Sequence, residues 1–135
     1  MNKSKQNKLF KKYSKIFRQK DLSPQESAMS FGIACGDGWY DIIDILCYYI
    51  QTYVDAGNIE QVEAVQVKSK WGTLRFYVNN TDDYIRGMIR MAEGMSERTP
   101  EMTPKEVFYK KGETLPPTGE SSFLKKCISL GELKI

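Results

Sequence analysis

The 135-residue chain contains no histidine and no CxxC pair. Imidazole is the commonest metal ligand of proteins and a frequent general base of enzymes. Its absence excludes Cys–His proteases, Ser–His–Asp hydrolases, zinc deaminases and HNH-type nucleases. Cys35, Cys47 and Cys127 are odd in number and widely spaced, so they predict buried or idle thiols instead of a disulfide framework or a zinc knuckle. We therefore expect no enzymatic activity, no metal and no cofactor.

Long apolar runs are also missing. No stretch reaches the eighteen or more apolar residues of a membrane span, and the lysine-rich start has no apolar core of the kind that a secretory signal needs. The chain is nevertheless 41% hydrophobic, which suffices for a core without disulfide or metal support. These features predict one cytoplasmic domain with no membrane contact.

Charge is distributed unevenly along the chain. Residues 1–20 contain eight basic residues and no acid, whereas the other 115 residues contain 12 basic and 17 acidic ones. Within this basic arm, Leu9, Tyr13, Ile16 and Phe17 recur at helical spacing and predict an amphipathic helix over residues 5–19. We expect its apolar stripe to dock on the body, with a membrane surface as the alternative.

A glycine-rich turn, Gly36-Asp37-Gly38-Trp39, precedes a central helix that ends at Gly57. Asp37 is predicted to cap this helix. A phosphate loop is disfavoured, because no GK[ST] or GxGxxG motif is present and Asp37 would repel an anion. Asp37, Asp41 and Asp44 could form a catalytic or Mg²⁺-binding set, but helix starts attract acids through the helix dipole alone. The predicted core positions of this helix are Trp39, Ile42, Ile43, Leu46, Tyr49, Ile50, Tyr53 and Val54.

From Val62 the apolar period changes to two, which predicts strands at about 62–69 and 73–80 around the loop Lys70-Trp71-Gly72. Alternation predicts that Val65, Val67, Leu74, Phe76 and Val78 face inward, and that Gln66, Lys68, Arg75, Tyr77 and Asn79 face outward. A third helix is predicted to be capped by Thr81 and to end near Ser96, with Ile85, Met88, Ile89, Ala92 and Met95 as its core stripe.

The predicted fold class is α+β. It comprises a basic helical arm (1–20), a core (21–98) with a central helix, a β-hairpin and a third helix, and an irregular tail (99–135), all within one domain (1–135). The tail is rich in proline and glycine. It is predicted to contain only short elements: strands at 107–111 and 131–135, and a brief helix through Cys127.

Two motifs are distinctive when taken together. They are the turn Cys35-Gly36-Asp37-Gly38-Trp39 and the hairpin Gln66-Val67-Lys68-Ser69-Lys70-Trp71-Gly72-Thr73-Leu74-Arg75-Phe76-Tyr77. Over residues 8–98 the chain resembles a family of uncharacterised bacteriophage and prophage proteins. The family implies a phage origin and an α+β body, and no known activity. Its members carry a CxxCG zinc knuckle after the third helix and further cysteines before the turn. This chain has Arg98-Thr99-Pro100 and Ala28 and Ser30 at those places, so the resemblance implies no metal site.

The outward face of the hairpin is the candidate partner-binding site. Its residues are Gln66, Lys68, Lys70, Trp71, Arg75 and Tyr77. Aromatic residues and arginine are common anchors of protein interfaces. We expect a phage accessory protein that binds a host protein stoichiometrically and blocks a defence or regulatory system. The alternative is a nucleic-acid-binding module that uses the same face and the basic arm, against which the negative charge of the body argues. Self-association through the aromatic residues also stays open.

Overall fold

A computed structural model describes residues 1–57 and 59–103. The predicted strands at 107–111 and 131–135, the helix through Cys127 and Cys127 itself lie outside these residues. The described elements are α1 (Lys3–Lys12), η1 (Arg18–Asp21), η2 (Ala28–Phe31), β1 (Ile33–Ala34), η3 (Asp37–Trp39), α2 (Tyr40–Asp55), β2 (Glu63–Lys70), β3 (Thr73–Asn79) and α3 (Asp83–Ser96), where η marks a short 3₁₀ helix.

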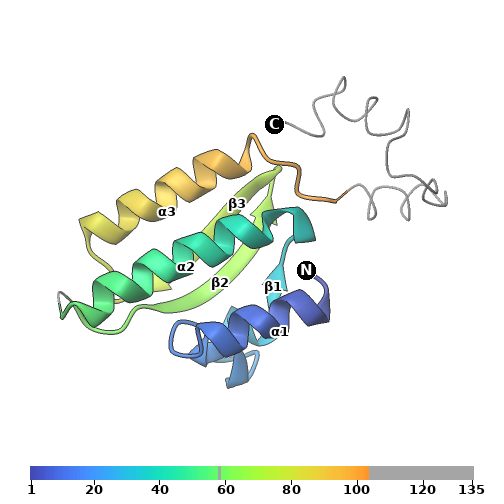
Figure 1. Cartoon of the computed structure of the whole chain (residues 1–135). Coiled ribbons are helices and arrows are strands. Elements are labelled where there is room, and N and C mark those ends of the chain that lie inside the picture. The colour runs from blue at the N-terminus through green and yellow to red at the C-terminus, as the bar shows by residue number, and fades with distance from the viewer. Residues whose placement is uncertain (58, 104–135) are drawn as a thin grey trace, which may run out of the picture.

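The three strands form one mixed sheet in the order β1-β2-β3. β1 pairs with β2 in parallel, and β2 pairs with β3 as an antiparallel hairpin. The helices α1, α2 and α3 lie on the same side of this sheet (Figure 1). The predicted α+β class and the predicted hairpin are therefore confirmed. No helix of the described residues is long and apolar enough to cross a membrane.

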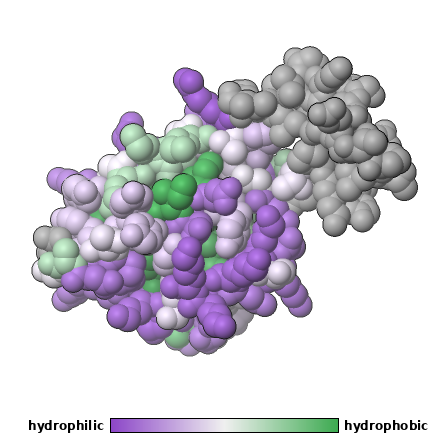
Figure 2. Space-filling model, viewed as in Figure 1, coloured by the Kyte–Doolittle hydropathy of each residue, from purple (hydrophilic) through white to green (hydrophobic). Residues whose placement is uncertain are grey.

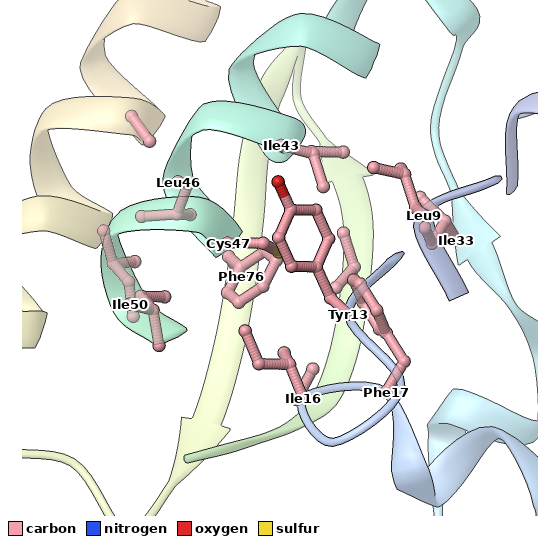
Figure 3. Packing of buried hydrophobic residues seen from close by; sticks show 14 of the residues in the cluster. Leu9, Tyr13, Ile16, Phe17, Ile33, Ile43, Leu46, Cys47, Ile50 and Phe76 are labelled. Carbon is pink, nitrogen blue, oxygen red and sulfur yellow. The ribbon is translucent and has the colours of Figure 1, made fainter. Parts of the chain in front are cut away.

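The core lies between the helices and the sheet. Ile43 and Cys47 of α2, Phe76 of β3, and Tyr13 and Phe17 from the segment after α1 point toward one another there (Figure 3). Burial in this core raises the pKa of the Cys47 thiol well above its usual value. The predicted apolar stripe of the basic arm is thus docked on the body, since Leu9, Tyr13, Ile16 and Phe17 are all buried.

The helix of the arm is shorter than predicted. α1 ends at Lys12, and Tyr13 adopts a non-helical conformation with φ −122° and ψ 52°. The reason is that the next residues bond to distant partners: Tyr13 Oη donates to Asp44 Oδ1 at 2.5 Å, and the Ile16 carbonyl accepts from Ala64 N at 2.8 Å. A continuing α-helix would keep the Ile16 carbonyl for its own backbone.

A β-bulge changes the inward face of β2. The register passes from Ala64 opposite Val78 to Gln66 opposite Tyr77, so Val65 is the extra residue. Val62, Ala64 and Val67 are buried, whereas Val65 is only half-buried. The prediction that Val65 shares the core face of Val67 was therefore wrong, because simple alternation does not continue through a bulge.

Two predicted core residues of the helices are exposed. Tyr49 on α2 and Met95 on α3 are 55% and 51% exposed. The buried stripe of α3 is Ile85, Ile89, Ala92 and Ser96. Ser96 is buried in place of Met95. The Ser96 hydroxyl accepts a hydrogen bond from Leu74 N at 2.9 Å, and this bond turns the Ser96 side of α3 toward the sheet.

The N-cap residue of α3 also differs from the prediction. It is Asp82 instead of Thr81, and Asp82 Oδ1 accepts a hydrogen bond from Ile85 N at 3.0 Å.

The turn at Gly36–Trp39, called the inner turn below, is covered by residues 99–101. Gly38 N donates to the Glu101 carbonyl at 2.8 Å, Gly36 N donates to Glu101 Oε2 at 3.0 Å, and Trp39 Nε1 donates to the Thr99 carbonyl at 2.8 Å. A Cβ atom on Gly38 would lie 2.0 Å from the Pro100 carbonyl oxygen. The glycines of the inner turn therefore allow a second backbone segment to approach closely.

Candidate functional site

The hairpin brings the predicted binding residues together on one face. In the register of β2 and β3, Gln66 lies opposite Tyr77 and Lys68 lies opposite Arg75. Lys70 lies opposite Thr73 at the end of the hairpin. Opposite residues of an antiparallel pair project to the same side of the sheet. Gln66, Lys68, Lys70, Arg75 and Tyr77 thus form one surface, called the basic face below.

The sixth predicted residue, Trp71, occupies the tip of the hairpin. Trp71 and Gly72 form the two-residue turn with φ angles of 56° and 76°, and positive φ at both positions is what a type I′ hairpin turn requires. Glycine, asparagine and aspartate suit this conformation, whereas a bulky side chain is strained in it. The side chain of Trp71 is 89% exposed. Folding thus gains little from tryptophan at this position.

The basic face contains a like-charge pair. Lys68 and Arg75 lie directly opposite each other, which destabilises a hairpin unless another group compensates. Neither residue forms an ion pair within the described part of the chain. Both residues are partly buried. The arrangement is suited to an anionic group of a partner, which would lie between the two cations.

A groove of about 690 Å³ runs between β3 and α3 and continues the basic face. Arg75 and Tyr77 belong to both surfaces. The opposite wall is a stripe of α3 formed by Arg86, Arg90, Glu93 and Glu97. Arg86 is paired with Asp83 at 2.8 Å, whereas Arg90 makes no ion pair with a described residue. The groove therefore places two cations and two acids of α3 beside the cations of the hairpin.

Arg86 and Arg90 were not predicted as site residues. Their spacing of four, continued by Glu93 and Glu97, places them on one face of a helix and could have indicated a polar stripe. Sequence alone does not show that this stripe lies beside β3. That position depends on the core stripe of α3, which was predicted with Met95 in place of Ser96.

Side chains of α3 occupy the outer edge of β3. Leu74 N donates to Ser96 Oγ at 2.9 Å, and Phe76 N donates to Glu93 Oε2 at 3.1 Å. These two amides would otherwise be open to pairing with another strand. A partner strand cannot pair with them without displacing Ser96 and Glu93. The side chains of the basic face and the groove are therefore more accessible than the backbone edge of β3.

The carboxylates at the start of α2 do not form a common site. Asp37 accepts from Asn2 N and Asn2 Nδ2 at 2.8 and 2.6 Å, and it belongs to η3 and is not the cap residue of α2. Asp44 accepts from Tyr13 Oη and from Lys12 Nζ at 3.0 Å. Asp41 is exposed. The three acids therefore face different surroundings, and no cluster of three or more metal-binding side chains is found among residues 1–57 and 59–103.

The Tyr13–Asp44 contact shifts the pKa of both groups. Burial, reinforced by the hydrogen bond to Asp44, raises the pKa of Tyr13. Burial by itself would raise the pKa of Asp44, but the hydrogen bonds from Tyr13 and Lys12 outweigh it and hold that pKa below its usual value. The ionised form of Asp44 is thus bound within the fold, and its role is to attach the arm to α2.

Several cations of the basic arm also make contacts within the fold. Arg18 forms a two-point hydrogen-bonded ion pair with Glu63, which lowers the pKa of that carboxyl. Lys20 pairs with Asp21 at 2.8 Å, and Lys5 lies over the Tyr40 ring at 5.3 Å from its centre. Lys3, Lys8, Lys11 and Lys15 are exposed and form no ion pair with a described residue. The arm is therefore both a docked element of the fold and a moderately basic surface.

Comparison of the chain with protein-family models, curated proteins and solved structures finds no match. The kinship with a phage protein family, inferred from the inner turn and the hairpin, thus stays a prediction.

Proposed function

We propose that the protein is a binding module that engages an acidic surface of a host protein through the basic face and the tip of its hairpin. The observation that carries this proposal is Trp71, which is 89% exposed in a backbone conformation that disfavours tryptophan. A large aromatic ring with no role in the core is the kind of anchor that fills a pocket of a partner. Lys68, Lys70 and Arg75 beside it form no ion pair with a described residue, and they supply electrostatic complementarity to an acidic rim.

The biological setting belongs to the same proposal. The motif resemblance supports a phage origin, and the missing histidines support action by binding instead of chemistry. Such a protein would act stoichiometrically in the cytoplasm of the host cell and would block a defence or regulatory protein. The test must therefore identify a partner and show that the hairpin binds it.

The test is affinity purification of the tagged full chain from infected cells, with nucleic acid digested. Wild-type protein is compared with Trp71→Asn, which suits the turn, and with Phe31→Ala, which removes an aromatic ring that is 75% exposed elsewhere on the surface. We expect one host protein to be retained by wild type and Phe31→Ala and lost with Trp71→Asn. Truncating Trp71 or Tyr77 should weaken that complex by about 2 kcal/mol or more, through faster dissociation. Equal recovery with all three proteins would contradict the proposal.

Nucleic acid is the second candidate, favoured by the adjacent cations Lys68 and Arg75. Each phosphate contact contributes to the dependence of the binding constant on salt. For a nucleic-acid partner, replacing Lys68, Lys70 and Arg75 would reduce the slope of log K against log salt by about three. We expect no binding to random oligonucleotides tighter than about 10 μM at physiological salt, which is within the range of non-specific contact. Submicromolar binding that the triple substitution abolishes would reverse the order of the two candidates.

A further inference from the structure

An uncharged apolar surface covers the outer side of α2 and α3. In Figure 2 the hydrophobic colours gather where these two helices lie in Figure 1. Ile45 is 57% exposed, Met91 71% and Met95 51%. The surface, called the helical face below, consists of Ile45, Tyr48 and Tyr49 of α2 and Tyr84, Met88, Met91 and Met95 of α3.

The exposure of the helical face is not required by the fold. Tyr49 and Met95 were predicted to be buried, and other residues occupy the buried stripes of their helices. Methionine is flexible and polarisable, and it is common at surfaces that bind other proteins. Contiguous apolar surface of this kind marks an interaction site in a folded protein. The helical face lies on the helix side of the sheet, so it is separate from the basic face of the hairpin (Figure 1).

The helices α2 and α3 are antiparallel, and contacts at both ends fix their relative position along the helix axis. Trp39, which precedes α2, donates to Thr99, which follows α3. At the other end, Tyr53 of α2 stacks on Tyr84 of α3 with ring centres 4.4 Å apart. The residue numbers along α2 therefore rise as those along α3 fall.

Two oppositely charged residues flank the same end of the helical face. Asp41 lies one turn before Ile45 on α2, and Arg98 lies three residues after Met95 at the end of α3. Both are exposed, and neither forms an ion pair with another described residue. Asp55, at the far end of α2, is also exposed. One end of the helical face thus carries an acid on α2 and a base at the end of α3, at the same position along the helix axis.

We propose that the helical face binds a second copy of this chain, with a twofold axis parallel to the helices. This axis places α2 of each copy against α3 of the other, and it leaves the position of every residue along the helix axis unchanged. Asp41 then meets Arg98 of the partner subunit, and the contact occurs twice by symmetry. A twofold axis across the helices would instead place α2 on α2 and bring Asp41 toward Asp55 of the partner subunit. The charges therefore select the first arrangement.

The size of the face bounds the area that a dimer could bury. A helix of 16 residues is about 24 Å long, and two packed helices are about 20 Å wide, which gives roughly 500 Å² per copy. The total of about 1,000 Å² is at the low end for a specific interface. Area alone does not set affinity, but an interface of this size suits a reversible dimer, and we expect a dissociation constant on the order of 10 μM.

Sedimentation equilibrium of the full chain from about 1 to 100 μM tests the proposal. The mass of wild type should rise from one chain toward two, and Met91→Glu should stay monomeric because it places a charge in the apolar contact. The charge reversals Asp41→Lys and Arg98→Asp should each weaken self-association at least tenfold. An equimolar mixture of the two variants should restore it, since both contacts in the mixed dimer then join opposite charges.

Several results would overturn the dimer. These are a monomeric wild type throughout the concentration range, a Met91→Glu variant that still dimerises, and a mixture of the charge-reversal variants that stays monomeric. Hydroxyl-radical labelling separates the remaining occupants. If Met91 is protected in a monomeric wild type, another part of the same chain covers the helical face. Circular dichroism of each variant checks that a variant that stays monomeric is still folded.

Discussion

The inner turn at Gly36–Trp39 and the hairpin tip at Trp71–Gly72 both combine glycine with tryptophan, but among the described residues another segment covers only the first. Trp39 is 1% exposed and its indole nitrogen is hydrogen-bonded to Thr99, whereas Trp71 is 89% exposed. A Cβ atom on Gly38 would collide with the backbone at Pro100, whereas one on Gly72 would meet nothing within 4 Å. The same residue types are therefore packed in the interior at the inner turn and exposed on the surface at the hairpin tip.

The two glycines illustrate this difference in physical terms. Gly38 is needed because a second backbone lies close to it, a requirement that comes from the tertiary structure. Gly72 is needed because its φ is +76°, a requirement that comes from the turn itself. Substitutions at the inner turn should therefore change folding, and substitutions at the hairpin tip should change binding more than folding.

The largest expected effect is that of Trp39→Ala. Removing a fully buried tryptophan leaves a cavity and orphans the Thr99 carbonyl, so the free energy of unfolding should fall by about 3–5 kcal/mol. Trp71→Ala is the matched control and should change stability by less than about 0.5 kcal/mol, as at other exposed positions. Urea denaturation measures both. Comparable losses for the two variants would remove the distinction between the turns.

Gly38→Ala tests the close approach of residues 99–101 directly. The added methyl group would lie 2.0 Å from the Pro100 carbonyl oxygen, so the backbone must shift and stability should fall by about 3 kcal/mol. Gly94→Ala is the control, because a Cβ atom there meets nothing within 4 Å and α3 should gain about 0.5–1 kcal/mol from alanine. An unchanged melting curve for Gly38→Ala would mean that residues 99–101 do not hold this position in solution.

The sequence predicted those parts of the fold that repeat a local pattern. The positions of α2, β2, β3 and α3 followed from apolar periodicity, and the docking of Leu9, Tyr13, Ile16 and Phe17 followed from the stripe they form. The cap of α3, Asp82 instead of Thr81, is a local error, but the larger errors involve partners elsewhere in the fold. α1 ends early because Tyr13 and Ile16 bond to Asp44 and Ala64, and the bulge at Val65 interrupts an alternation that looks regular in sequence.

The candidate site shows the same division. The basic face follows from strand alternation after Val65, so all its members were predicted together. The groove was missed because it depends on the rotation of α3, which is set by the bond between Ser96 and Leu74. The cover over the inner turn was missed because residues 99–101 carry no periodic signal. Their contacts with Gly36 and Gly38 are sixty residues or more away in the chain.

Tyr13→Phe tests a third packed contact, the attachment of the basic arm to α2. The variant removes a hydrogen bond to the Asp44 carboxylate, so it should lower stability at neutral pH by about 1.5 kcal/mol. The folded state lowers the pKa of Asp44, so this stability is present above the unfolded pKa and is lost as pH falls through the folded one. The difference between wild type and variant should therefore shrink below about pH 4. Urea midpoints measured across this range provide the check; a constant difference would contradict it.

Trp71→Asn separates display from folding at the hairpin tip. Asparagine tolerates positive φ better than tryptophan does, so the free energy of unfolding should rise by about 0.5–1 kcal/mol. The gain should appear in urea denaturation of the isolated protein. Loss of stability would show that the exposed ring supports the hairpin, and Trp71 would then no longer be an argument for a binding site.

Arg75→Gln should have the smallest effect on stability, and it tests the charge repulsion within the basic face. Lys68 and Arg75 are directly opposite each other, so neutralising one should stabilise the hairpin by about 0.5 kcal/mol. Salt screens the repulsion in wild type, so the gain should be largest at low ionic strength and should diminish near 1 M salt. Lys70→Gln is the control, because Lys70 lies opposite the uncharged Thr73. Urea midpoints at low and high salt measure both variants. If Arg75→Gln destabilises the protein at low salt, Arg75 has a compensating partner, and the basic face is not held ready for an anionic group.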